Sequence, residues 1–206
     1  MEATMTPPAS YPVSLEIDRP DTQSRLTNFP LFGWLIRAIL LIPHYVVLAF
    51  LGMVASLVYF IATFAILFTG RYPQGMFNFS VGVVRWSLAV NAYQLHLIDS
   101  YPAFTMNPQA NVRFDVGYPA GLSRFLNLPF FGLYIKLFLL IPNLVVWYFL
   151  SLIAYLLTFF APFAILFTGS YPAGMHSFVV GYVRWSARIQ AYTLAFTDKY
   201  PPFGMN

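Results

Sequence analysis

The chain has 206 residues, of which 59% are hydrophobic, 19% aromatic and only 9% charged, and its formal net charge is +4. Because a soluble domain usually has about 25% charged residues, this composition argues against a water-soluble fold and predicts an integral membrane protein. Cysteine is absent, which excludes disulfides, thiolate metal sites and a cysteine nucleophile. The few basic residues are scattered, so we expect no nucleic-acid partner.

The chain is two copies of one unit, related by an offset of 99 residues without a gap. Residues 29–107 align with 128–206, and more than half of these positions are identical. With the weaker similarity upstream, the units are 12–107 and 111–206, separated by a linker at 108–110 and preceded by a tail at 1–11. A repeat of this size dictates the fold, so we expect two tandem structural repeats.

Each unit opens with a short segment of alternating polarity, Val13–Asp18 in the first and Val112–Val116 in the second. A period of two predicts a half-buried β-strand. A strand this short is not stable alone, so the two strands should pair with each other or with a partner.

A long apolar segment follows in each unit, at about 33–69 and 132–168. Its internal proline, Pro43 or Pro142, should kink the helix or separate a short entry turn from the main span. The main spans, 44–69 and 143–168, exceed the roughly 20 residues that cross a bilayer.

Each apolar helix ends at a Gly-x-Tyr-Pro-x-Gly segment, which we interpret as a structural hairpin turn. Glycine tolerates the left-handed conformation that ends helices, and tyrosine suits the aromatic belt at a membrane interface. The turn residues are Gly70, Tyr72, Pro73 and Gly75 in the first unit, and Gly169, Tyr171, Pro172 and Gly174 in the second.

The second helix of each unit, 76–98 or 175–197, has polar residues on two opposed faces, which is typical of a helix packed between neighbours. Two such similar copies should face the same way, which requires two crossings per unit. We therefore predict an all-α membrane protein with two tandem helical hairpins, four transmembrane helices and short β segments. The alternative is one span per unit and one interfacial helix.

The loop charges predict the orientation of this multi-pass protein. If each unit is a hairpin, both turns lie on one side of the membrane and most basic residues on the other. Because basic residues accumulate in the cytoplasm, both termini should be cytoplasmic.

Several polar residues are candidate contacts for lipids or partners. Arg85 and Arg184 lie about 13 Å beyond the turn of a crossing helix, where a charge is costly and indicates a function. The alternative is a staple between helices. Asn91 and Gln190 are the further candidates, at equivalent positions of the two second helices.

Two ion pairs are predicted to close the hairpins, because their members lie at the same expected depth. They are Arg37 with Asp99 and Lys136 with Asp198.

Catalytic and cofactor signals are weak. His44 and His96 could ligate a haem or a pigment, but their repeat partners are Asn143 and Ala195, so no symmetric cofactor site can form. Metal-binding, phosphate-binding and nucleophile motifs are absent. We expect no enzyme activity, no cofactor and no metal.

The repeated pattern Phe-Thr-Gly-x-Tyr-Pro-x-Gly-Met, Val-x-Arg-Trp, Ala-Tyr and Asp-x-Tyr-Pro-x-Phe resembles a bacterial membrane family known as domain of unknown function 4389. The resemblance covers both units and implies a bacterial inner-membrane protein, with no activity to carry over. The function hypothesis is a non-catalytic membrane subunit or scaffold that packs against a larger complex, such as a respiratory or photosynthetic one. The alternatives are a small transporter or channel for an anion or a lipid headgroup, using Arg85 and Arg184, and a self-assembling homo-oligomer that organises membrane.

Overall fold

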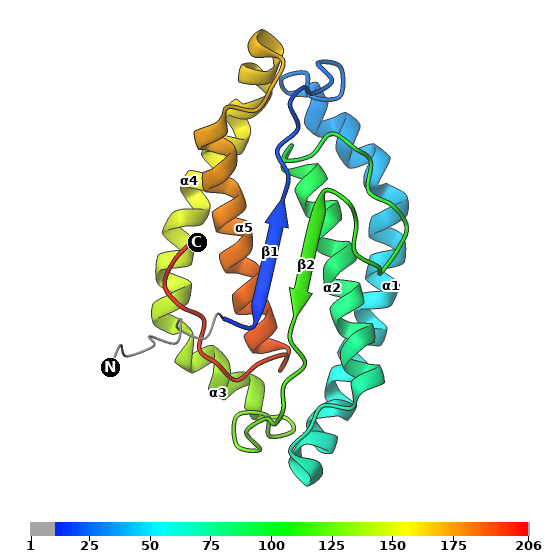
Figure 1. Ribbon diagram of the computed structural model, residues 1–206, viewed down its shortest axis with the longest axis vertical. Coiled ribbons are helices and arrows are strands. Elements are labelled where there is room, and N and C mark those ends of the chain that lie inside the picture. Colours follow the sequence, from blue (N-terminus) through cyan, green and yellow to red (C-terminus); the bar gives the residue numbers. More distant parts are fainter. Residues whose placement is uncertain (1–10, 206) are drawn as a thin grey trace, which may run out of the picture.

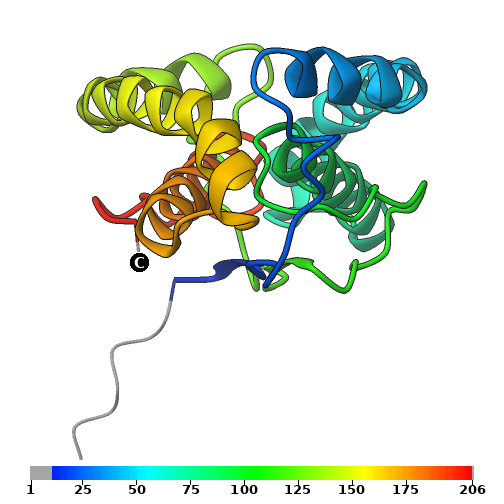
Figure 2. The same cartoon turned by 90° about the horizontal axis from the view of Figure 1, so that it is seen from above.

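The computed structural model describes residues 11–205, so the expected tail at 1–11 lies, apart from its last residue, outside the described part. Three layers are stacked on one another (Figures 1 and 2). One outer layer is a β-ribbon, the middle layer is a pair of helices, and the other outer layer holds the most apolar helices. These are, in order, β1 (Val13–Ile17) with β2 (Val112–Val116), α2 (Gln74–Gln94) with α5 (Ala173–Thr193), and α1 (Phe32–Thr69) with α3 (Gly132–Leu139) and α4 (Ile141–Thr168).

The two apolar helices end where glycine was expected to end them. Gly70 and Gly169 adopt the left-handed conformation, with φ of 71° and 78°, and their backbone N–H groups bond back into the helix. Pro73 and Pro172 then cap the following helices. The helical hairpins α1–α2 and α4–α5 therefore form as predicted, although α2 and α5 begin two residues earlier and end four earlier than expected.

Proline has different effects in the two copies. α1 continues through Pro43 and is 38 residues long, whereas the second copy breaks at Leu140, just before Pro142, into α3 and α4. The Tyr101 hydroxyl donates a 2.8 Å hydrogen bond to the Leu40 carbonyl, and Tyr200 makes the equivalent 3.3 Å bond to Leu139 in the copy that breaks. The expected separation into an entry turn and a main span is thus found only in the second copy.

The strands pair with each other, and each packs on the helices of the other copy. Val13 lies opposite Val116 and Ile17 opposite Val112 in an antiparallel register. β1 packs on α5 and β2 packs on α2. Alternate side chains of both strands are buried, so one face of the ribbon completes the core and the other faces outward.

The middle helices are enclosed on two sides, as their two polar strips predicted. The closest approach is at Gly82 and Gly181, where an added Cβ would lie 2.9 Å from Met106 Cβ and 2.7 Å from Met205 Cβ. Only glycine leaves room there for the segment that follows each helix.

The expectation that both copies face the same way along the hairpin axis is wrong. The two copies are antiparallel, so the two Tyr-Pro turns lie at opposite ends of the long axis (Figure 1). At one end Leu122 N donates to Gly70 O, and at the other Gln23 N donates to Gly169 O, each at 2.8 Å. The parity argument failed because the copies are related by a two-fold rotation through the ribbon and not by a translation.

Two described helices, Phe32–Thr69 and Ile141–Thr168, are long and apolar enough to cross a membrane. The middle helices do not meet this criterion, so four transmembrane helices are not supported. Their polar and buried composition fits a layer inside the protein.

Candidate functional site

The first polar cluster surrounds Arg37, which is fully buried at the beginning of α1. Its guanidinium group lies 3.0 Å from Asp99 Oδ1. It also donates to Asn28 Oδ1 at 2.8 Å and to the carbonyls of Tyr93 and Ile98. This arrangement closes the first hairpin and anchors the chain that enters it, so Arg37 has a structural role.

The second cluster repeats the first with a lysine. Lys136 Nζ donates to Asn127 Oδ1 at 2.7 Å and to Tyr192 O at 2.9 Å, and lies 3.5 Å from Asp198 Oδ1. Burial lowers the pKa of Lys136 to about 8, and the carboxylate of Asp198 opposes that shift. The two expected ion pairs therefore come together at equivalent places.

Arg85 and Arg184 point toward the ribbon, away from the apolar outer layer. Arg85 Nε donates to Phe114 O on β2, and Arg184 Nε donates to Leu15 O on β1, both at 2.9 Å. Each guanidinium also binds a carbonyl of the segment after its helix, at Met106 or Met205. The geometry is that of the staple, and each staple joins one copy to the strand of the other.

The histidines occupy separate places and do not form a shared site. His44 Nδ1 accepts a 2.9 Å hydrogen bond from Trp86 Nε1, and Asn143 accepts the equivalent bond from Trp185. His96 is buried, bonds to Asn28 Oδ1 at 2.7 Å, and has its pKa lowered to about 3, first by burial and then by the charge of Arg37. No cluster of three metal-ligating side chains occurs within residues 11–205.

The turn residues are joined to the opposite copy. The Tyr118 hydroxyl donates to Tyr72 O, while Gln23 Oε1 accepts from Tyr171 N at 3.1 Å. Gln23 Nε2 also donates to His96 O at 2.8 Å. Sequence reasoning missed Gln23, because the residue aligned with it, Leu122, uses only its backbone for the equivalent contact.

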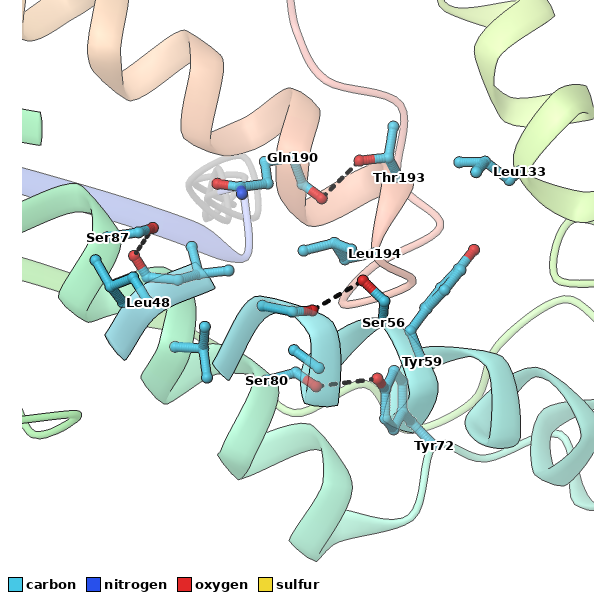
Figure 3. A pocket seen from close by; sticks show the side chains of 14 residues that line it. Leu48, Ser56, Tyr59, Tyr72, Ser80, Ser87, Leu133, Gln190, Thr193 and Leu194 are labelled. Carbon is cyan, nitrogen blue, oxygen red and sulfur yellow. Dashed lines mark hydrogen bonds between the residues drawn. The ribbon is translucent and has the colours of Figure 1, made fainter. Parts of the chain in front are cut away.

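Asn91 and Gln190 lie in a cleft between the two hairpins, which pack on the ribbon more than on each other. Two cavities occupy this cleft, and Ser87 and Gln190 line both. The first measures about 470 Å³ and the second about 290 Å³. Figure 3 shows the larger one, with Tyr59 and Tyr72 on one side and Gln190 on the other.

The two cavities are equivalent by the internal symmetry but differ in how far side chains fill them. Three lining residues of the first cavity have larger, aromatic counterparts in the second. The pairs are Leu48 with Trp147, Ser56 with Tyr155, and Val83 with Tyr182. Trp147 stacks on Tyr182 with ring centroids 5.6 Å apart, and its Nε1 donates to Ser186 Oγ at 2.7 Å. Side chains thus partly fill the second cavity, whereas the first is left unfilled, and we call the first one the open cavity.

A family model described as a domain of unknown function, DUF4389, matches residues 33–106 and 132–204. The chain belongs to this family. Neither a curated protein nor a solved structure matches it.

Each DUF4389 match begins after the strand of its copy, so the exchanged ribbon lies outside the matched regions. The open cavity lies inside them, and sequence reasoning missed it. The signal was present in the alignment of the two copies, at the few positions where a smaller residue in one copy aligns with a large aromatic residue in the other. Asn91 and Gln190 were found because they are polar, but the space beside them depends on apolar neighbours.

Proposed function

We propose that this DUF4389 protein is a non-catalytic membrane scaffold that lies flat in one leaflet, with α1, α3 and α4 in the lipid and the ribbon in water. One observation carries the proposal. Within residues 11–205, every exposed large hydrophobic side chain on a helix belongs to α1, α3 or α4, and none belongs to α2 or α5. An apolar surface of this extent marks a membrane or protein contact.

The charges lie on the opposite face. The outer side of the ribbon carries Glu16, Asp18, Arg113 and Asp115, all exposed. Arg113 pairs with Glu16 at 3.1 Å and with Asp18 at 2.7 Å. The layers therefore run from an apolar face to a charged face, which is the polarity of a protein seated at a membrane surface.

A spanning orientation conflicts with the direction of the ribbon. The strands run along the middle helices (Figure 1), and the Arg85 and Arg184 staples hold them near the helix centres. If the helices crossed the bilayer, the charged ribbon face would lie at its centre, where each charge costs about 2.5–3.5 kcal/mol. α1 also measures about 57 Å at 1.5 Å per residue, nearly twice the thickness of the hydrocarbon core.

Both ends of the molecule suit the level of the phosphate groups. Arg25 is exposed and is followed by Leu26, which is 74% exposed; Arg124 is exposed and is followed by Phe125, which is 65% exposed. Such a pair can place its apolar side chain among acyl chains and its guanidinium beside a phosphate. Each basic residue near an anionic surface contributes about 1 kcal/mol.

We place the protein on the cytoplasmic leaflet of a bacterial inner membrane, which is the membrane that the family resemblance implies. The outward ribbon and the ends of the described chain then face the cytoplasm. In this position the protein can hold a larger membrane assembly or a second copy, which are the scaffold roles we propose. Arg85 and Arg184 bind carbonyls beside the ribbon, and Arg85 also lies 3.7 Å from Asp115, which argues against the transporter alternative.

Because the chain has no cysteine, single cysteines report on orientation without background. We choose Gln74→Cys and Ala173→Cys in the two turns, Asp115→Cys on the ribbon, and Met53→Cys and Phe149→Cys on the apolar face. Each variant is expressed in a bacterium and treated with a membrane-impermeant maleimide, in spheroplasts and in inverted vesicles.

The two turns provide the decisive comparison. In the flat orientation, both turn cysteines and the ribbon cysteine are labelled in inverted vesicles only, and the two apolar-face cysteines react only after detergent is added. In a multi-pass orientation, the two turns react from opposite sides, because the hairpins are antiparallel. That result would overturn the proposal, as would rapid labelling of Met53→Cys in intact vesicles.

A further inference from the structure

We infer that the open cavity between the hairpins binds one acyl chain of a bilayer phospholipid. This inference rests on the proposed flat orientation of the protein in one leaflet. The cavity of about 470 Å³ is within the range of ligand sites, which are about 300–1,000 Å³. It is built mainly by α1, α2 and the end of α5.

The cavity reaches the apolar face of the protein. Ser56 on α1 and Leu133 on α3 line it, and both are exposed on the outer layer that we place in lipid. A lipid of the surrounding leaflet can therefore enter sideways without crossing the charged ribbon.

The lining suits an uncharged acyl chain that carries a hydrogen-bond acceptor. Leu48, Ala55, Val83, Val84 and Leu194 form its apolar walls, and no lysine, arginine or carboxylate lines it. A charged headgroup therefore has no counter-charge inside and must stay at the mouth. The apolar acyl chain matches the apolar walls.

The lining has one buried polar group without a partner, beside the partly buried side-chain amide of Gln190. The Tyr59 hydroxyl is buried and has no hydrogen-bond partner among the described residues. The other lining hydroxyls are engaged: Ser56 donates to Gly52 O, Ser87 donates to Val84 O, and Tyr72 lies 3.4 Å from Ser80 Oγ. An unpaired buried hydroxyl is costly, and the ester carbonyl of a lipid is a matching acceptor.

The internal repeat supplies the counter-example. In the second cavity, Trp147 and Tyr182 take the space that a chain would occupy, and Trp147 itself donates to Ser186. The equivalent Ser87 in the first cavity receives no such bond, because Leu48 stands where the second copy has Trp147. The two copies therefore predict one bound chain per protein, not two.

The experiment exchanges the distinguishing residues between the copies. The filled variant carries Leu48→Trp, Ser56→Tyr and Val83→Tyr, and the opened variant carries Trp147→Leu, Tyr155→Ser and Tyr182→Val. Each protein is reconstituted in vesicles of phosphatidylcholine and phosphatidylglycerol, tested for flotation with the vesicles, extracted in mild detergent, and examined by native mass spectrometry for retained phospholipid.

We expect one retained phospholipid on the natural chain, none on the filled variant and two on the opened variant, with equal flotation of all three. Tyr59→Phe, which keeps the cavity volume, should weaken retention roughly fivefold through loss of one hydrogen bond. Ser56→Tyr alone serves if the triple filled variant does not fold, because Ser56 is exposed and bonds only within its own helix.

Two results would overturn the inference: equal retention on all variants, or a natural chain that floats with vesicles and retains no phospholipid. The natural chain is also extracted directly from bacterial membranes, and a retained molecule with the mass of an isoprenoid and not of a phospholipid would refute the inference as well. If the natural chain does not float with the vesicles, the proposed membrane orientation is refuted instead, so the two proposals fail separately.

Discussion

Replacing each buried cation by methionine tests whether the two hairpin-closing clusters stabilise the fold as their geometry implies. Arg37→Met and Lys136→Met keep an unbranched, flexible side chain but remove the charge and its donors. Both cations are fully buried, so water cannot replace the lost hydrogen bonds without opening the structure.

The magnitude follows from the acceptors left behind. Removing one member of a buried ion pair costs about 3–5 kcal/mol. Arg37 serves five acceptors, including Asp99 at 3.0 Å, whereas Lys136 donates to two and lies 3.5 Å from Asp198. We therefore expect a loss of about 4 kcal/mol for Arg37→Met and about 3 kcal/mol for Lys136→Met.

Urea unfolding in a mild detergent, followed by far-ultraviolet circular dichroism, measures both losses. The matched control is Lys136→Arg, which imports the side chain of the first copy into nearly the same surroundings and should change the unfolding free energy by less than about 1.5 kcal/mol. If either methionine variant costs below about 1 kcal/mol, the clusters do not hold the hairpins and the reasoning is refuted.

Three further outcomes follow from the structure. The unfolding free energy should fall as the pH drops from about 6.5 toward 3, because unfolded His96 takes up a proton that the folded ring, with its pKa of about 3, refuses; His96→Ala should flatten this part of a pH series of urea titrations. Gly132→Ala should cost about 1–3 kcal/mol, since its Cβ would lie 2.7 Å from a backbone carbonyl, whereas Gly75→Ala, with nothing within 4 Å, should change the thermal midpoint little; equal effects would contradict the packing argument. Arg184→Gln should cost about 2 kcal/mol through two lost carbonyl bonds yet leave vesicle flotation unchanged, and a loss of flotation would point to lipid contact instead.

The sequence predicted the features that depend on local chemistry. Glycine at 70 and 169 had to end a helix, alternating polarity at 13–17 and 112–116 had to form half-buried strands, and Arg37 needed a carboxylate at its own level along the hairpin. Each of these needs only neighbouring residues or the geometry of one hairpin.

The relation between the copies could not be predicted in the same way. Because the two units are so similar, the buried face of β1 fits the helices of either copy, and periodicity does not say which copy covers it. Helix hydropathy likewise gives length and apolarity but not the direction of the ribbon beside the helix. The depth expected for Arg85 assumed that its helix crosses the bilayer, and in the structure its guanidinium lies against the strand.

The exchange of strands also sets the order in which the molecule can be completed. β1 precedes α5 in the chain, and the arginine that holds it, Arg184, comes 169 residues after Leu15. β1 therefore cannot complete its packing until α5 has been synthesised. α1 is synthesised before α5 and can reach the membrane before the strand is covered. A chain with a single unit would have to borrow its strand from a second molecule, as in a domain-swapped dimer. Joining two units in one gene product removes that dependence on concentration, and it frees each half to change alone, which identical subunits cannot do.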